Sequence, residues 1–188
     1  MFKLDKRLES DTILVKELES FQVRLMNARE FFWIVLIPNK PNLTELSDLN
    51  INERNYLMNF AIDLGKFIKS SEKYDKVNIG MLGNVVSQLH LHIILRTKND
   101  AAWPGPVWGC DFNNLDEKTK EYRSKLISEF SIRLFNQISS FLTNRIILDL
   151  FLSPLLSSLF LPLFFETEFL LESVWKYHQI LLIIFAFE

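Results

Sequence analysis

Cysteine and glycine are both scarce in this sequence of 188 residues. The single cysteine, Cys110, excludes an internal disulfide and any cysteine-rich zinc module. All five glycines lie between Gly65 and Gly109, and none belongs to a GxxxxGK[ST] or GxGxxG loop. The first ten residues also lack the apolar run of a secretory signal. Together with the lone cysteine, this favours a cytoplasmic setting.

The chain has little net charge, with a formal value of -2. Dedicated nucleic-acid-binding domains usually carry a strongly basic face, so this value argues against a nucleic-acid partner. An apolar content of 48%, with 23% charged residues, excludes disorder for the bulk of the chain. The length predicts one domain, or one domain with an appendage.

Residues 141–188 differ in composition from the rest of the chain. They have two permanent cations against five carboxylates, and they contain eight of the 17 phenylalanines and no glycine. Residues 146–165 have the length of a membrane-spanning helix, but Asp149 and two prolines inside them argue against insertion. We therefore expect an apolar helical extension packed on the domain or on a partner. Membrane contact by residues 146–187 stays open without being favoured, as does an extension without a selected role.

Hydrophobic periodicity in residues 1–140 predicts an α+β fold, in which helices pack on a mostly antiparallel sheet. Four strands are expected, at residues 21–27, 31–37, 76–82 and 86–95. The first two strands form a hairpin, and a turn around Gly83 and Asn84 separates the last two.

Two helices are expected between and after these strands. Asn50 or Asn52 caps the first helix. Its buried face is expected to comprise Leu57, Phe60, Ala61, Leu64 and Ile68. The second helix runs from about Asp116 into the 130s, and its apolar residues at four-residue steps are Tyr122, Leu126, Phe130 and Leu134.

Two of the three histidines lie in the sequence Gln88-Leu-His90-Leu-His92-Ile-Ile. On a strand the three polar side chains would share one face, with the imidazoles roughly 7 Å apart. One interpretation is a solvated strand face. A second is a metal site, although zinc needs a third protein ligand that this segment does not supply. A third is catalysis, in which one imidazole attacks a substrate and its neighbour supports the charge on it.

The same segment resembles the signature of the histidine triad (HIT) family, His-φ-His-φ-His-φ-φ with φ apolar, in which Gln88 replaces the first histidine. Residues 25–46, 77–96 and 102–109 also resemble a bacterial subgroup of that family that often has Gln at this position. The likeness covers about residues 10–110. The domains expected are a HIT domain at 1–115, its C-terminal helix at 116–140 and the apolar extension at 141–188.

The resemblance implies a nucleotide hydrolase or transferase that acts at the α-phosphate of a purine nucleotide conjugate, such as a phosphoramidate or a dinucleoside polyphosphate. His90 matches the nucleophile that forms a nucleotidyl-histidine intermediate. His92 matches the residue that hydrogen-bonds the phosphate and assists the leaving group. Gln88 can position a substrate but cannot carry a proton. A homodimer, no cofactor and no metal are also implied. The alternatives are a nucleotide-binding module without turnover and a membrane-associated interaction protein.

The resemblance implies four further nucleotide contacts, namely Asn27, Asn78, Asn84 and Trp103. Each also has a structural interpretation, as a turn or strand-edge asparagine or as a buried tryptophan. Phe32 and Trp33 are assigned to the core. Arg96 either neutralises a polyphosphate or lies solvated at the end of a strand.

Overall fold

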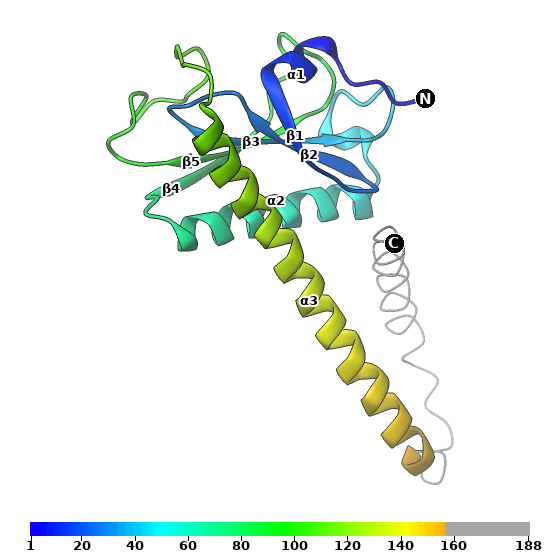
Figure 1. Ribbon diagram of the computed structural model, residues 1–188. Coiled ribbons are helices and arrows are strands. Elements are labelled where there is room, and N and C mark those ends of the chain that lie inside the picture. Colours follow the sequence, from blue (N-terminus) through cyan, green and yellow to red (C-terminus); the bar gives the residue numbers. More distant parts are fainter. Residues whose placement is uncertain (157–188) are drawn as a thin grey trace. The chain divides into compact units, whose positions relative to one another are not determined.

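The computed structural model describes residues 1–156. Its elements are α1 (Lys6–Asp11), β1 (Thr12–Glu17), β2 (Phe21–Met26), β3 (Phe32–Pro38), the short 3-10 helix η1 (Leu46–Asp48), α2 (Ile51–Ser71), β4 (Lys76–Gly80), β5 (Leu91–Arg96) and α3 (Glu117–Leu156) (Figure 1). The chain divides into two units, residues 1–130 and 131–188. Of the second unit, the structure describes only residues 131–156, which continue α3. The sheet and the candidate site described below belong to the first unit.

The five strands form one sheet in the order β1-β2-β3-β5-β4, and all neighbouring strands are antiparallel. Every residue of β3 and β5 is buried, because these strands occupy the middle of the sheet and are covered. Helix α2 lies across one face of the sheet (Figure 1). A Cβ added to Gly65 would lie 2.8 Å from Cγ1 of Val77, so glycine allows α2 to approach β4 closely. The predicted α+β fold is confirmed.

Both predicted helices are present. The side chain of Asn50 caps α2 by accepting from the backbone amides of Asn52 and Glu53. All five residues predicted for its core face are buried. Asp116 accepts from the amide of Thr119 at the start of α3. The predicted core face of α3 is only partly right, because Tyr122 is half exposed.

The predicted strands 76–82 and 86–95 are longer than the strands observed, which end at Gly80 and begin at Leu91. Residues 81–90 instead form a loop. Backbone groups in its second half bond other loops, as when the amide of Leu89 donates to the carbonyl of Leu43 over 2.8 Å. These contacts replace the strand ladder that alternation alone predicted. Helix α1 and strand β1 were not predicted.

The C-terminal extension falls mostly outside the described residues. Helix α3 reaches Leu156, and residues 157–188 are not described. Within residues 1–156, no helix combines the length and apolarity needed to cross a bilayer. The domain boundaries at residues 115 and 140 stay predictions.

Candidate active site

The two histidines of the motif lie side by side but in different structural settings. His92 is in β5, where it pairs with Val35 of β3 and Gly80 of β4, and only 4% of its surface is exposed. His90 lies just before β5 and is 7% exposed. Their ring centroids are 4.8 Å apart and the rings are nearly perpendicular. The predicted strand face with imidazoles about 7 Å apart is therefore wrong, because His90 is outside the strand.

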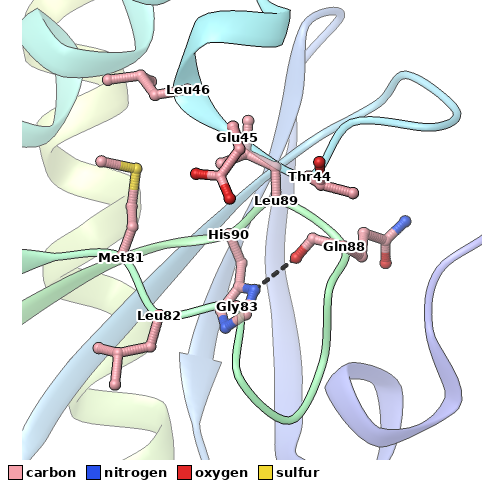
Figure 2. Close-up of a pocket in the computed structure, with 9 residues that line it drawn as sticks. All are labelled: Thr44, Glu45, Leu46, Met81, Leu82, Gly83, Gln88, Leu89 and His90. Atoms are coloured by element: carbon pink, nitrogen blue, oxygen red, sulfur yellow. Dashed lines mark hydrogen bonds between the residues drawn. The ribbon is translucent and has the colours of Figure 1, made fainter.

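The ring of His90 turns back toward its own backbone. Its Nδ1 lies 2.6 Å from the carbonyl oxygen of Gln88, as the dashed line in Figure 2 shows. A carbonyl oxygen only accepts hydrogen bonds, so Nδ1 of His90 must carry the proton. In the neutral ring, Nε2 then has a free lone pair.

The ring of His92 has the opposite tautomer. The indole Nε1 of Trp33 lies 2.8 Å from Nδ1 of His92. An indole N–H only donates, so Nδ1 of His92 accepts and the proton sits on Nε2. The site thus places a ring with a free Nε2 lone pair beside a ring with an Nε2–H donor.

His92 is held in its neutral form. Burial, reinforced by the neighbouring His90, lowers the pKa of His92 from its usual 6.5 to about 3. An uncharged His92 at neutral pH is a hydrogen-bond donor through Nε2 and carries no positive charge before a ligand arrives.

Tryptophan rings enclose His92 on two sides. The ring centroids of Trp33 and Trp108 lie 5.3 and 5.5 Å from that of His92. Trp33 is buried, which confirms its predicted place in the core, whereas its hydrogen bond to His92 was not predicted. The sequence did contain a signal for this bond, because Trp33, an aromatic residue with an N–H donor, lies on a strand predicted to belong to the same sheet as the motif. Strand register, which sequence alone does not give, decides whether that donor reaches the histidine.

Gln88 contributes to the pair through its backbone, and its side chain has other partners. Figure 2 shows its amide extending away from the ring of His90. The amide Nε2 donates to the carbonyl of Lys3 over 3.0 Å, and Oε1 accepts from the amide of Asp5 over 2.8 Å. The first position of the motif therefore binds the N-terminal segment of the chain.

A pocket of about 210 Å³ opens beside His90. Residues 44–46 form one wall, residues 81–83 another, and residues 88–90 complete the lining (Figure 2). The lining combines apolar side chains with polar ones, among them His90 and the carboxylate of Glu45. A ligand in this pocket would lie against His90.

Asn78 lies in a buried polar cluster. Its Oδ1 accepts from Nη1 of Arg96 over 3.0 Å, and Arg96 forms a two-pronged ion pair with Asp100 over 2.7 and 2.8 Å. Asp100 raises the pKa of Arg96, and the guanidinium holds the pKa of Asp100 below its usual value. Arg96 is 2% exposed, so the prediction of a solvated strand-end residue is wrong.

The other three predicted nucleotide contacts differ in their local settings. Oδ1 of Asn27 accepts from the amide of Leu115 over 2.9 Å. Asn84 is exposed in the loop 81–90. Trp103 is 37% exposed and its ring lies 5.7 Å from the guanidinium carbon of Arg96. In the described part of the chain, no group of three or more His, Cys, Asp or Glu side chains is placed to hold a metal ion.

Several solved structures are similar to this chain over about two thirds of its length. A histidine triad protein from Sinorhizobium meliloti is 36% identical, with a TM-score of 0.65, and the match covers 68% of this chain and 96% of that one. One from Bradyrhizobium japonicum is 34% identical, with the same score and the same coverage. One from Marinobacter aquaeolei is 33% identical, with a TM-score of 0.66 and coverage of 69% and 96%. The chain belongs to the histidine triad (HIT) family.

The sequence model of the HIT domain family matches residues 7–99, which include His90 and His92. No curated protein matches the sequence. Membership of the HIT family supports nucleotide binding or nucleotide hydrolysis as the activity.

Proposed function

We propose that this HIT protein cleaves purine nucleotide conjugates at the α-phosphate through a nucleotidyl intermediate on His90. The opposite tautomers of the two histidines carry the proposal. His90 offers an Nε2 lone pair, as a nucleophile needs, and His92 offers an Nε2–H, as a donor to phosphate oxygen needs. The pocket beside His90 provides room for part of the substrate.

The reaction proceeds in two displacements at phosphorus. In the first, Nε2 of His90 attacks, a P–N bond forms, and the leaving group departs with the bonding electron pair and takes up a proton from solvent. The imidazole becomes cationic, and the carbonyl of Gln88, already bonded to Nδ1–H, stabilises that charge. In the second, water attacks phosphorus, the P–N bond breaks, and the proton released balances the one taken up earlier.

His92 supports charge on the phosphate. A neutral imidazole gives up its remaining proton very reluctantly, so the lowered pKa of His92 fits a hydrogen-bond donor to phosphate oxygens. The bond from Trp33 keeps the proton on Nε2, where that donor is required. Gln88 keeps its carbonyl role without taking part in proton transfer.

The proposal extends to the other contacts and to the assembly. The exposed residues Asn84 and Trp103 are candidates to touch the nucleotide directly. Asn27 and Asn78 use their amide oxygens within the protein, so a contact with ribose or phosphate would come from their amide nitrogens. A homodimer in the cytoplasm is the setting we propose.

The test uses adenosine 5′-phosphoramidate and mass spectrometry of the whole protein. Wild-type protein is expected to release AMP and to form a transient adenylyl adduct that maps to His90. His90→Ala should form neither, whereas Asn84→Ala should still form the adduct. Binding of AMP without an adduct or release, on this substrate and on a dinucleoside polyphosphate, would leave a nucleotide-binding module as the function.

A further inference from the structure

The N-terminal arm, residues 1–5, pairs with the side chain of Gln88. The Oε1 atom of Gln88 accepts from the amide of Asp5, and its Nε2 donates to the carbonyl of Lys3. These two backbone groups flank Leu4, so the amide of Gln88 satisfies them as the backbone of a neighbouring strand would. Glutamine suits this position because one amide supplies both a donor and an acceptor.

The arm itself is anchored independently of Gln88. Phe2 and Leu4 pack against the core cluster that contains Trp33, and Leu8 of α1 is buried in the same cluster. The carboxylate of Asp5 caps α1 by accepting from the amide of Arg7 over 2.8 Å. The arm therefore provides a fixed point from which Gln88 can be held.

Gln88 contacts both the N-terminal arm, through its side chain, and His90, through its backbone carbonyl. The carbonyl oxygen of Gln88 receives Nδ1–H of His90 over 2.6 Å, which sets both the tautomer and the direction of the ring. Restricting the side chain of Gln88 at two atoms restricts the peptide that carries this oxygen. A connected path thus runs from the backbone of Lys3 and Asp5, through Gln88, to His90.

We propose that Gln88 is a positioning residue, which the N-terminal arm holds so that its carbonyl aims His90 at the substrate phosphorus. The inference rests on the proposed function and assigns a task to the residue that departs from the family signature. Losing the arm contact would leave the walls formed by residues 44–46 and 81–83 unchanged but would let the ring of His90 sample unproductive directions. Because attack requires close alignment, turnover would fall more than binding.

A proline at position 5 tests the path with little change elsewhere. Asp5→Pro removes the amide donor to Gln88, and the φ of -61° at Asp5 already suits proline. It also removes the carboxylate cap, so the matched control is Asp5→Ala, which loses the cap but keeps the amide. Gln88→Leu changes the other side of the contact and removes both bonds, the one from the amide of Asp5 and the one to the carbonyl of Lys3.

The readouts are kcat, KM and the proton NMR signal of His90 Nδ1–H in the full chain. Asp5→Pro and Gln88→Leu should lower kcat about tenfold or more with KM within about threefold, and should speed solvent exchange of that proton. Asp5→Ala keeps the amide that bonds Gln88, so its kcat and its exchange rate should lie much closer to wild type than those of Asp5→Pro. Equal kcat and equal exchange for Asp5→Pro and Asp5→Ala would overturn the proposal.

Two further outcomes are distinguishable. If Asp5→Pro does not fold, Gln88→Leu decides, because it removes both bonds to the arm; wild-type kcat and exchange in this variant would overturn the proposal. If wild-type protein releases no AMP, the proposed function fails, while the exchange of His90 Nδ1–H still reports whether the arm orients the ring.

Discussion

Trp33 donates its indole N–H to Nδ1 of His92 across adjacent strands, over a distance of 2.8 Å. The contact arises from register, because β3 pairs with β5 so that Trp33 stands opposite Ile94, two residues beyond His92. A large side chain on one strand reaches such a diagonal neighbour. One core tryptophan thereby sets which nitrogen of His92 bears the proton.

Removing that indole N–H is expected to impair catalysis, although an aromatic ring still occupies most of the space of the Trp33 side chain. Trp33→Phe leaves Nδ1 of His92 without its donor, and if the transition state loses roughly 1–3 kcal/mol of stabilisation, kcat should fall about five- to 160-fold. The matched control is Trp108→Phe, since the indole N–H of Trp108 is buried and finds no partner among the described residues. Steady-state kinetics and nitrogen NMR of His92 check the pair. Equal losses in both variants would contradict a role for the Trp33 bond.

The free energy of unfolding is expected to fall as the pH drops from about 6.5 toward 3. The cause is the protonation of His92 in the unfolded chain but not in the folded one. The folded pKa of about 3 lies below the unfolded value of 6.5, so in this window the unfolded state binds one more proton. Stability therefore rises with pH, by at most about 1.4 kcal/mol per pH unit from this residue.

Urea unfolding between pH 5 and 7 measures this slope. His92→Gln keeps an acceptor for Trp33 but does not titrate, so its curve should be flatter than that of the wild type. Carboxylates such as Asp100, whose pKa is lowered by Arg96, contribute below this window. Parallel curves for the two proteins would show that His92 is not the group responsible.

The main features of the fold could be predicted because hydrophobic period depends on local sequence. The helical face of α2 and the central strand β3 stand out through spacing and a continuous apolar run. Strand β1 is at the edge of the sheet and alternates weakly, so its pairing partner, and not its own pattern, makes it a strand. Long-range contacts also decide the structure of residues 86–90. Their alternating pattern would extend β5, but Leu89 bonds Leu43 in another loop, and the segment is not a strand.

The residue types of the candidate site could be predicted from the sequence, but their hydrogen-bond partners could not. The residue types near His90 and His92 predicted phosphate chemistry through the family signature. The partners of Gln88, however, lie more than 80 positions away, in the N-terminal arm. Such long-range contacts leave no local periodic signal. The ion pair between Arg96 and Asp100 spans only four positions, but its burial, with a further bond from Arg96 to the carbonyl of Gly105, is set by the loop after β5 and has no periodic signal either.

Breaking the Arg96–Asp100 pair is expected to destabilise the domain strongly. Asp100→Asn leaves the buried guanidinium without its countercharge, which typically costs about 3–5 kcal/mol. The exposed pair of Lys125 and Glu129 provides the control, because Lys125→Gln should change the free energy of unfolding by less than about 1 kcal/mol. Urea unfolding at neutral pH compares them, and similar midpoints would mean that the buried pair adds no more than the surface pair.

A methyl group at position 80 is expected to disturb the wall of the His92 site. A Cβ at Gly80 would lie 3.0 Å from Cη2 of Trp108, and the ring of Trp108 packs on His92. Gly80→Ala should therefore lower the free energy of unfolding by about 1–3 kcal/mol through overpacking. Gly83→Ala is the control for stability, since nothing lies within 4 Å of its added Cβ, and its effect should stay within about 0.5 kcal/mol. Tryptophan fluorescence recorded during urea unfolding reports the stability of both variants, as a signal averaged over the four tryptophans. If the two variants unfold at the same midpoint, Trp108 yields to the methyl group without cost, and the close approach of β4 to this ring does not constrain the site.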